Sequence, residues 1–166
     1  MRIMGVDPGL AITGFGFVEE HGGNFRWIAS GCIRTGQESA ASLRLEQIFN
    51  RVLELAGEYR PDALALEKLF FSKNTRTALQ VGEARGTVIL AASQSNLPLF
   101  EYTPLQVKQA VAGYGKAEKE QVQKMVQLLL QLKEIPAVDD EADALAVALC
   151  HLQHRRFQDA VKGGGA

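Results

Sequence analysis

The feature that most restricts the fold stands at the start of the chain, where residues 1–9 join an apolar segment to an aspartate and a Pro-Gly turn. The apolar segment predicts a buried strand. Aspartate is rare in strands and is costly to bury without a partner. Asp7 is therefore either the first residue of the turn, since Asp-Pro-Gly is favourable turn chemistry, or a functional group at a strand end. The positions of the other carboxylates decide between these two roles.

Apolar periodicity predicts two further strands, a helix, a strand, a helix, a strand and then helices. Strands that alternate with helices imply right-handed crossovers and parallel pairing, whereas the three opening strands form an antiparallel meander. We therefore predict an α/β fold with a five-stranded mixed sheet, a three-strand antiparallel meander plus two parallel strands, flanked by helices. The strands are expected within residues 1–9, 13–18, 25–33, 62–66 and 97–102, and the helices at 39–59, at 74–95 and from about residues 104, 117 and 139.

A length of 166 residues predicts one domain with a sizeable core. We expect this domain to span residues 1–157 and the glycine-rich end, residues 158–166, to be a flexible tail. No apolar run approaches the roughly 20 residues that cross a bilayer, and the N-terminus lacks the features of a signal peptide, so no membrane contact and a cytoplasmic location are expected. Cys32 and Cys150 are expected to be reduced thiols in the core.

A second carboxylate, Glu67, also follows a predicted strand, at residues 62–66. In open sheets of this kind, functional sites form beyond the carboxyl ends of the strands. Asp7 and Glu67 both stand at such an end, so the two side chains are expected to face one site.

An acidic segment at residues 139–143 opens the last predicted helix, ahead of the apolar run 144–149. Acidic residues at a helix N-terminus commonly act as caps, and that role suits Asp139. It suits Asp143 poorly, because this residue lies inside the helix in a run of Ala and Leu. Asp140 precedes Asp143 by three residues and so shares its face of the helix. Asp139 remains a rival for Asp140, and the three-residue spacing favours Asp140.

Four carboxylates can thus converge at one edge: Asp7, Glu67, Asp140 and Asp143. Their mutual repulsion requires a positive charge among them, and an all-oxygen ligand set selects a hard cation such as Mg²⁺ or Mn²⁺. Two such ions about 3.5–4 Å apart support in-line displacement at a phosphodiester. The carboxylates therefore indicate a metal-dependent nuclease.

The charge distribution fits a nucleic-acid substrate. The net charge is −1, yet residues 68–133 carry nine Lys and Arg against four Asp and Glu, while both flanks are acidic. A phosphate-binding face beside an acidic pocket would give this pattern. A solvated helix face would give it as well, so charge alone leaves both interpretations open.

Several short motifs stand out along the chain: Gly5-Val6-Asp7-Pro8-Gly9, Leu66-Glu67 with Phe70 following, Ala84-Arg85-Gly86, Val107-Lys108-Gln109, Ala117-Glu118-Lys119 and Asp140-Glu141-Ala142-Asp143-Ala144-Leu145-Ala146. Together they resemble the RuvC family of Holliday-junction resolvases, part of the RNase H-like superfamily. The resemblance covers residues 1–157 and implies an RNase H-like nuclease domain. It implies that the four carboxylates are catalytic and hold two Mg²⁺ ions per active site, with Mn²⁺ able to substitute. Some relatives place a histidine in the final cluster; this chain does not, which removes a candidate general base.

The same resemblance implies a set of DNA-binding residues. Lys108 and Lys119 match lysines that contact the junction backbone near the cut. An exposed Phe70 could cover unstacked bases at the crossover, although aromatic side chains in loops usually join a core. The full set is Phe70, Lys73, Arg76, Lys108, Lys116 and Lys119.

The family also implies an activity and partners. Its members cut four-way junctions by paired symmetric nicks, leaving 5′-phosphate and 3′-hydroxyl ends, in DNA recombination and repair. The helix at 74–95 would form the interface of a homodimer, in which small residues allow close approach: Gly82, Ala84, Gly86, Ala91 and Ala92. The RuvAB branch-migration complex would be a further partner.

Other function classes remain open from the sequence. The segment 5–9 followed by Thr13-Gly14 also resembles the phosphate loop of actin-like ATPases and sugar kinases, but these pair two related domains and 166 residues hold one. A catalytically silent RNase H-like binding module is less consistent with four retained carboxylates. Cleavage of RNA–DNA hybrids is a further alternative, because the chemistry alone does not reveal the substrate's shape.

Overall fold

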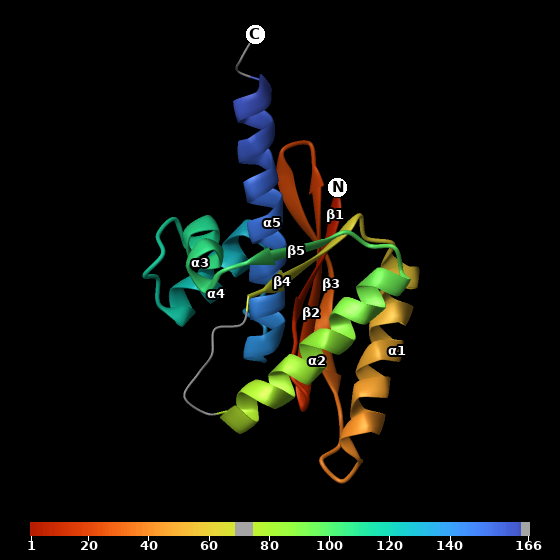
Figure 1. Cartoon of the computed structure of the whole chain (residues 1–166). Helices are drawn as coiled ribbons and strands as arrows, with labels where there is room; N and C mark the ends of the chain where they lie inside the picture. The colour runs from red at the N-terminus through yellow and green to blue at the C-terminus, as the bar shows by residue number, and fades with distance from the viewer. Residues whose placement is uncertain (69–74, 164–166) are drawn as a thin grey trace.

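The computed structural model describes residues 1–68 and 75–163, and its elements follow the order predicted from the sequence (Figure 1). They are β1 (Arg2–Asp7), β2 (Ile12–His21), β3 (Asn24–Arg34), α1 (Ala41–Tyr59), β4 (Ala63–Glu67), α2 (Thr75–Gln94), β5 (Leu99–Tyr102), α3 (Pro104–Ala112), α4 (Lys119–Leu130) and α5 (Asp139–Gly163).

The strands of the described residues form one five-stranded sheet in the order β3-β2-β1-β4-β5. β2 pairs antiparallel with β1 and β3, and β4 pairs parallel with β1 and β5. The predicted mixed sheet is therefore confirmed. Because β1 is central, its last residue, Asp7, lies between the ends of two neighbouring strands.

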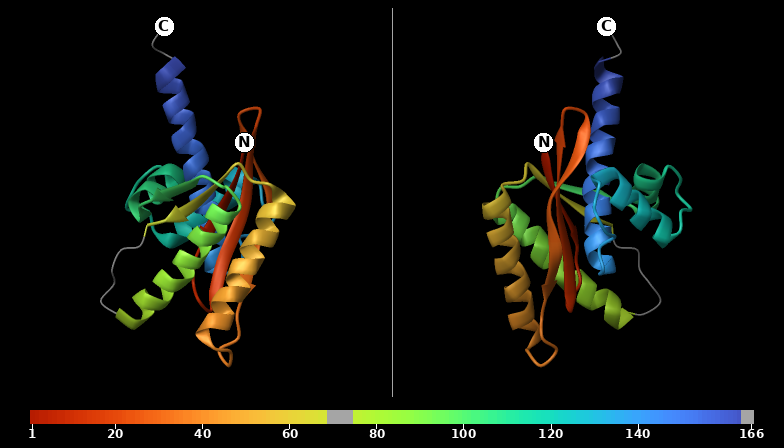
Figure 2. Two further views of the ribbon diagram at one scale, coloured as in Figure 1. Left: turned by 45° about the vertical axis from the view of Figure 1, so that its right-hand side comes forward. Right: turned by 180° about the vertical axis from the view of Figure 1, so that it is seen from behind.

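Helices cover both faces of the sheet (Figure 1 and Figure 2). α5 lies along one face with α3 and α4 beside it, and α1 and α2 cover the other. Side chains alternate along β1, so that Ile3 packs in the core with α5, whereas Met4 packs with α1 and α2. Continuing this alternation along β1 and β4 places Asp7 and Glu67 on the face that α5 covers.

Glycines on that face let α5 approach the sheet backbone. A Cβ atom on Gly5 would lie 2.0 Å from the carbonyl oxygen of Ala144, and one on Gly14 would lie 1.9 Å from that of Asp140. Such distances are far below van der Waals contact, so only glycine fits. The first turns of α5 are thereby seated directly on the end of β2 that pairs with Asp7.

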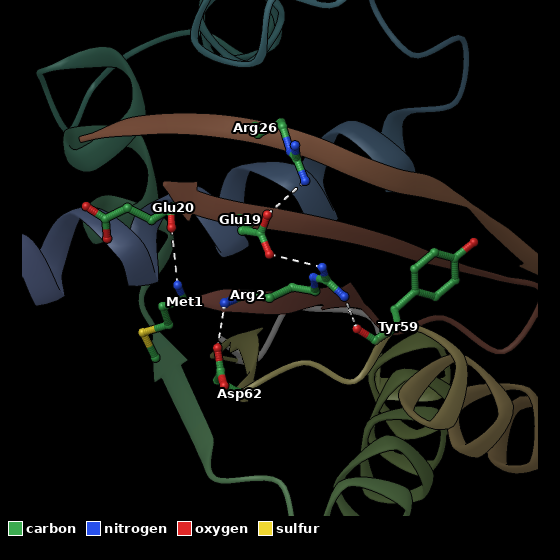
Figure 3. A network of polar contacts seen from close by, with 7 residues as sticks. All are labelled: Met1, Arg2, Glu19, Glu20, Arg26, Tyr59 and Asp62. Carbon is green, nitrogen blue, oxygen red and sulfur yellow. Dashed lines mark hydrogen bonds and ion pairs between the residues drawn. The ribbon is translucent and has the colours of Figure 1, made fainter. Parts of the chain in front are cut away.

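A polar network fixes the opposite end of β1 (Figure 3). The Arg2 side chain donates to Glu19 at 3.0 Å and to the carbonyl of Tyr59, while its backbone N–H donates to Asp62 at 2.7 Å. Arg26 of β3 also pairs with Glu19, at 3.0 Å. These contacts join the start of β1 to β2, β3, the end of α1 and the α1–β4 connection.

Two details differ from the sequence predictions. Residues 158–163 continue α5, where a flexible tail was expected from residue 158. Cys150 is buried as predicted, but Cys32 is only partly buried, and both are free thiols. Among the described helices, none combines the length and apolar character that a membrane span requires.

Candidate active site

The four predicted carboxylates come from three elements that meet at one end of the sheet. Asp7 ends β1, Glu67 ends β4, and Asp140 and Asp143 lie in the first turns of α5. Asp7 pairs with Gly14 of β2, and the backbone of Asp140 lies against the same glycine. The close seating of α5 thus brings its acidic turn to the end of β1.

The charges of these carboxylates influence one another. Burial, together with the charges of Asp143, Asp140 and Glu67, raises the pKa of Asp7 from 3.8 to about 7. Burial and the charge of Asp143 also raise the pKa of Glu67, and burial raises the pKa of Asp143. The site therefore holds more negative charge than its own residues neutralise, which favours binding of a cation.

Two lysines lie beside the carboxylates. A hollow of about 230 Å³ is lined by Glu67, Asp143, Lys108 and Lys119, together with apolar residues of α3, α4 and α5. The Nζ atom of Lys119 lies 3.1 Å from a carboxylate oxygen of Asp143 and 3.1 Å from one of Asp139. Lys119 thus stands between the acidic turn of α5 and the hollow.

Asp139 and Asp140 have different surroundings. Asp139 accepts hydrogen bonds from Lys119 and from Gln123 at 2.8 Å, and these bonds lower its pKa. Asp140, in contrast, is one of the residues whose charge raises the pKa of Asp7. This difference supports Asp140 over Asp139 as the partner of Asp7, in line with the three-residue spacing.

The donor set fits a hard divalent cation, because every candidate ligand is a carboxylate oxygen. In their present rotamers, however, no three His, Cys, Asp or Glu side chains of the described residues stand close enough together to hold a metal ion. Asp143 is paired with Lys119 instead. Binding of an ion by the four carboxylates would therefore require their side chains to rotate towards one another.

The remaining predicted DNA-binding residues are only partly described. Lys116 is exposed in the α3–α4 connection. Arg76 belongs to α2, but its side chain lies outside the described part of the structure, as do Phe70 and Lys73 altogether. For these three residues the predicted DNA contacts stay predictions.

Comparison with known proteins decides the family. A family model described as crossover junction endodeoxyribonuclease RuvC matches residues 3–151. The chain belongs to the RuvC family. A crossover junction endodeoxyribonuclease RuvC from Pelotomaculum thermopropionicum is 56% identical over 162 residues, which cover 98% of this chain and 99% of that relative. One from Brevibacillus brevis is 53% identical, with 98% of each chain covered.

Solved structures of RuvC and of a more distant resolvase share the fold. Thermus thermophilus RuvC in complex with Holliday junction substrate is 40% identical and matches with a TM-score of 0.91, over 95% of this chain and 96% of that one. The yeast mitochondrial Holliday junction resolvase Ydc2 is 14% identical with a TM-score of 0.65, covering 97% and 83% of the two chains, and shows the fold alone. The RNase H-like fold predicted from the motifs is confirmed.

Some contacts around the RuvC-family carboxylates were not predicted from the sequence, although Arg85 stands in the Ala84-Arg85-Gly86 motif. Ser30 of β3 donates to Glu141 at 2.6 Å and so ties the first turn of α5 to the sheet. Arg85 of α2 donates to the backbone carbonyl of Glu67 at 3.2 Å and forms an ion pair with Glu101. These partners are far apart in the chain, so no spacing rule could have joined them.

Proposed function

We propose that this chain is an endonuclease that resolves four-way DNA junctions by paired symmetric nicks, leaving 5′-phosphate and 3′-hydroxyl ends, in DNA recombination and repair. The observation that carries the proposal is the meeting of four carboxylates and two lysines at one sheet end, in a chain that matches the RuvC family over residues 3–151. The solved complex of Thermus thermophilus RuvC with junction substrate supports the same assignment. Family membership does not support the ATPase or the silent-module alternative.

Asp7, Glu67, Asp140 and Asp143 would hold two Mg²⁺ ions per active site, with Mn²⁺ able to replace them. When bound, such ions supply an activated water and stabilise negative charge at the phosphodiester. Lys108 and Lys119, which line the hollow beside Glu67 and Asp143, would bind the phosphate backbone and keep the scissile bond at the carboxylates. Lys119 would exchange its ion pair with Asp143 for a phosphate contact.

The outer face of α2 supports a homodimer. Leu79 and Leu90 are 65% and 60% exposed, and they lie on one helical face with Gly82 and Gly86. Apart from the adjacent residues and the backbone of α2 itself, no described atom lies within 4 Å of the Cβ position of either glycine, so another backbone could approach closely there. The other small residues predicted for the interface, Ala84, Ala91 and Ala92, are buried in the chain's own core instead. A two-fold axis through this face would present two equivalent active sites to the junction, which symmetric nicking requires. RuvAB as a partner and a cytoplasmic location remain part of the proposal by family resemblance.

A cleavage assay tests the proposed function. The protein should cut a synthetic four-way junction when Mg²⁺ is added and should not cut it in EDTA. A linear duplex and an RNA–DNA hybrid of the same sequence serve as controls. Preferential cutting of the hybrid, or hydrolysis of ATP with no junction cleavage, would contradict the proposal.

Replacing Lys108 or Lys119 with alanine should weaken junction binding regardless of sequence and slow cleavage. Each lost phosphate contact should make the slope of log K against log salt shallower by about 0.9. Arg51→Ala is the matched control, because Arg51 is an exposed residue of α1 that pairs with Glu54. Fluorescence anisotropy at several salt concentrations measures the slope, and an unchanged slope for both lysine variants would show that neither touches a phosphate.

Leu90→Glu should convert the dimer to a monomer, because it places like charges against each other in the proposed interface of α2. Leu128→Glu is the matched control, since Leu128 is 67% exposed but lies on α4. Sedimentation velocity of both variants measures the effect. A dimer that persists in Leu90→Glu would remove this face of α2 as the interface.

A further inference from the structure

The backbone of Glu67 is contacted by a residue of α2, which covers the face of the sheet opposite to the carboxylates. Its side chain lies on the α5 face, where it lines the hollow with Lys108 and Asp143. Its backbone carbonyl accepts a hydrogen bond from Nη1 of Arg85, a residue of α2, at 3.2 Å. Because α2 covers the other face, Arg85 contacts Glu67 from behind the site.

A second contact holds Arg85 in place. Its Nη2 atom forms an ion pair with Glu101 of β5, and its side chain is only 13% exposed. The guanidinium group stays charged at any ordinary pH, and its fixed fork can bind two acceptors at once. A buried charge of this kind is strongly held by its partner, since losing the partner would leave it uncompensated. Arg85 therefore bridges β4 and β5 at a defined position.

The bridge lies where the sheet pairing ends. Glu67 is the last residue of β4, and its neighbour across the ladder is Tyr102, which ends β5. The chain then leaves the strand, with the Lys68 N–H donating to the carbonyl of Tyr102 at 2.7 Å. A terminal peptide has ladder support on one side only, so a hydrogen bond to its carbonyl restricts how the peptide can rotate.

We infer that Arg85 is a positioning residue that fixes the Glu67 peptide and thereby aims the Glu67 carboxylate into the active site. This inference rests on the proposed function, because the carboxylate is taken as a metal ligand. Ligands must be held within about 0.5 Å and 10–20° of productive geometry, and the residues behind them supply that precision. Partners of this kind typically change metal affinity or activity by about 10- to 100-fold when they are removed.

A direct role in DNA binding is inconsistent with the geometry of Arg85. Both terminal nitrogens are engaged, by Glu67 and by Glu101, and the side chain is mostly buried. A phosphate contact would require both bonds to break. Loss of Arg85 should therefore leave the salt dependence of junction binding unchanged, which distinguishes it from Lys108 and Lys119.

Arg85→Ala and Arg85→Lys, made in the whole 166-residue chain, test the inference. The lysine variant keeps a positive charge beside Glu101 but lacks the fork that reaches two acceptors. Mn²⁺ affinity without DNA is measured by calorimetry, and cleavage is measured in single turnovers with Mg²⁺ and saturating enzyme. In Arg85→Ala we expect the Mn²⁺ affinity and the cleavage rate each to fall by about 10- to 100-fold, whereas the junction affinity and its salt slope should stay unchanged. In Arg85→Lys the Mn²⁺ affinity and the cleavage rate should each fall by about 10-fold.

Arg155→Ala is the matched control, because Arg155 is an exposed arginine of α5 that pairs with Asp159 at 3.7 Å. It should match the wild-type protein in every measurement. Unchanged Mn²⁺ affinity and cleavage in Arg85→Ala would overturn the inference. A shallower salt slope in Arg85→Ala would also overturn it, because Arg85 would then contact a phosphate. If Arg85→Ala fails to fold while Arg85→Lys behaves like the wild type, the role of Arg85 is one of packing, and the inference is again overturned. If the wild-type protein fails to cut junctions, the proposed function falls, whereas the Mn²⁺ titrations still report on Arg85.

Discussion

Replacing Asp7 with asparagine should lower junction cleavage by more than about 100-fold, because even the residues behind a metal ligand are worth 10- to 100-fold. Junction binding should stay the same or tighten. The change removes a negative charge from a site where Asp143, Asp140 and Glu67 already repel one another, so it also lessens repulsion of the DNA phosphates. Gel shift in EDTA and cleavage in Mg²⁺ measure the two effects. Equal losses in both would mean that Asp7 is structural.

The same variant should be more heat-stable than the wild type when metal is absent. The folded-state pKa of Asp7 is about 7, above its ordinary 3.8, so the ionised carboxylate opposes folding. The opposition is largest above pH 7 and declines as the pH falls from 7 towards 3.8. Asp7→Asn should therefore raise the melting temperature in EDTA at pH 8 and lose that advantage near pH 4. Asp159→Asn makes the same chemical change at an exposed position of α5 and is the control.

The order of strands and helices could be predicted from the sequence because apolar residues follow simple patterns along the chain. The apolar runs that end at Asp7 and Glu67 were predicted as strands, and the structure confirms both as β1 and β4. The unusual placement of Asp143 inside an apolar helix pointed to the third element of the site. In each case a carboxylate stood where the surrounding strand or helix would ordinarily have an apolar residue.

Contacts between distant elements could not be predicted in this way. The buried bond between Tyr102 and His151, 2.7 Å from oxygen to Nδ1, joins the end of β5 to the middle of α5, and no pattern marked either residue. The ion pair of Lys119 with Asp143 was also unforeseen, because it depends on how α4 packs against α5. The end of the last helix was not predicted from the sequence, and the structure continues α5 to Gly163, where the glycines of the chain end begin.

Gly14→Ala should disrupt both stability and cleavage, because this glycine sets the distance between α5 and the end of β1. A Cβ atom there would lie 1.9 Å from the carbonyl oxygen of Asp140, 2.2 Å from its carbon and 2.9 Å from the Glu141 nitrogen. All three are backbone atoms, so the strain cannot be relieved by rotating a side chain. We expect the free energy of unfolding to fall by about 1–3 kcal/mol or more, as for overpacked cores.

The displaced first turn of α5 should also take Asp140 and Asp143 away from Asp7. Cleavage by the folded Gly14→Ala protein should therefore fall by more than about 100-fold, because two carboxylates move rather than one supporting contact. Gly57→Ala in α1 is the matched control, since no described atom beyond the adjacent residues and the backbone of α1 lies within 4 Å of its Cβ position. That change should stabilise the protein by about 0.5–1 kcal/mol, because alanine favours helix over glycine, and leave cleavage intact. Chemical denaturation and single-turnover cleavage of the two variants make the comparison. A Gly14→Ala protein that melts and cuts like the wild type would show that α5 is not held to the site through this glycine.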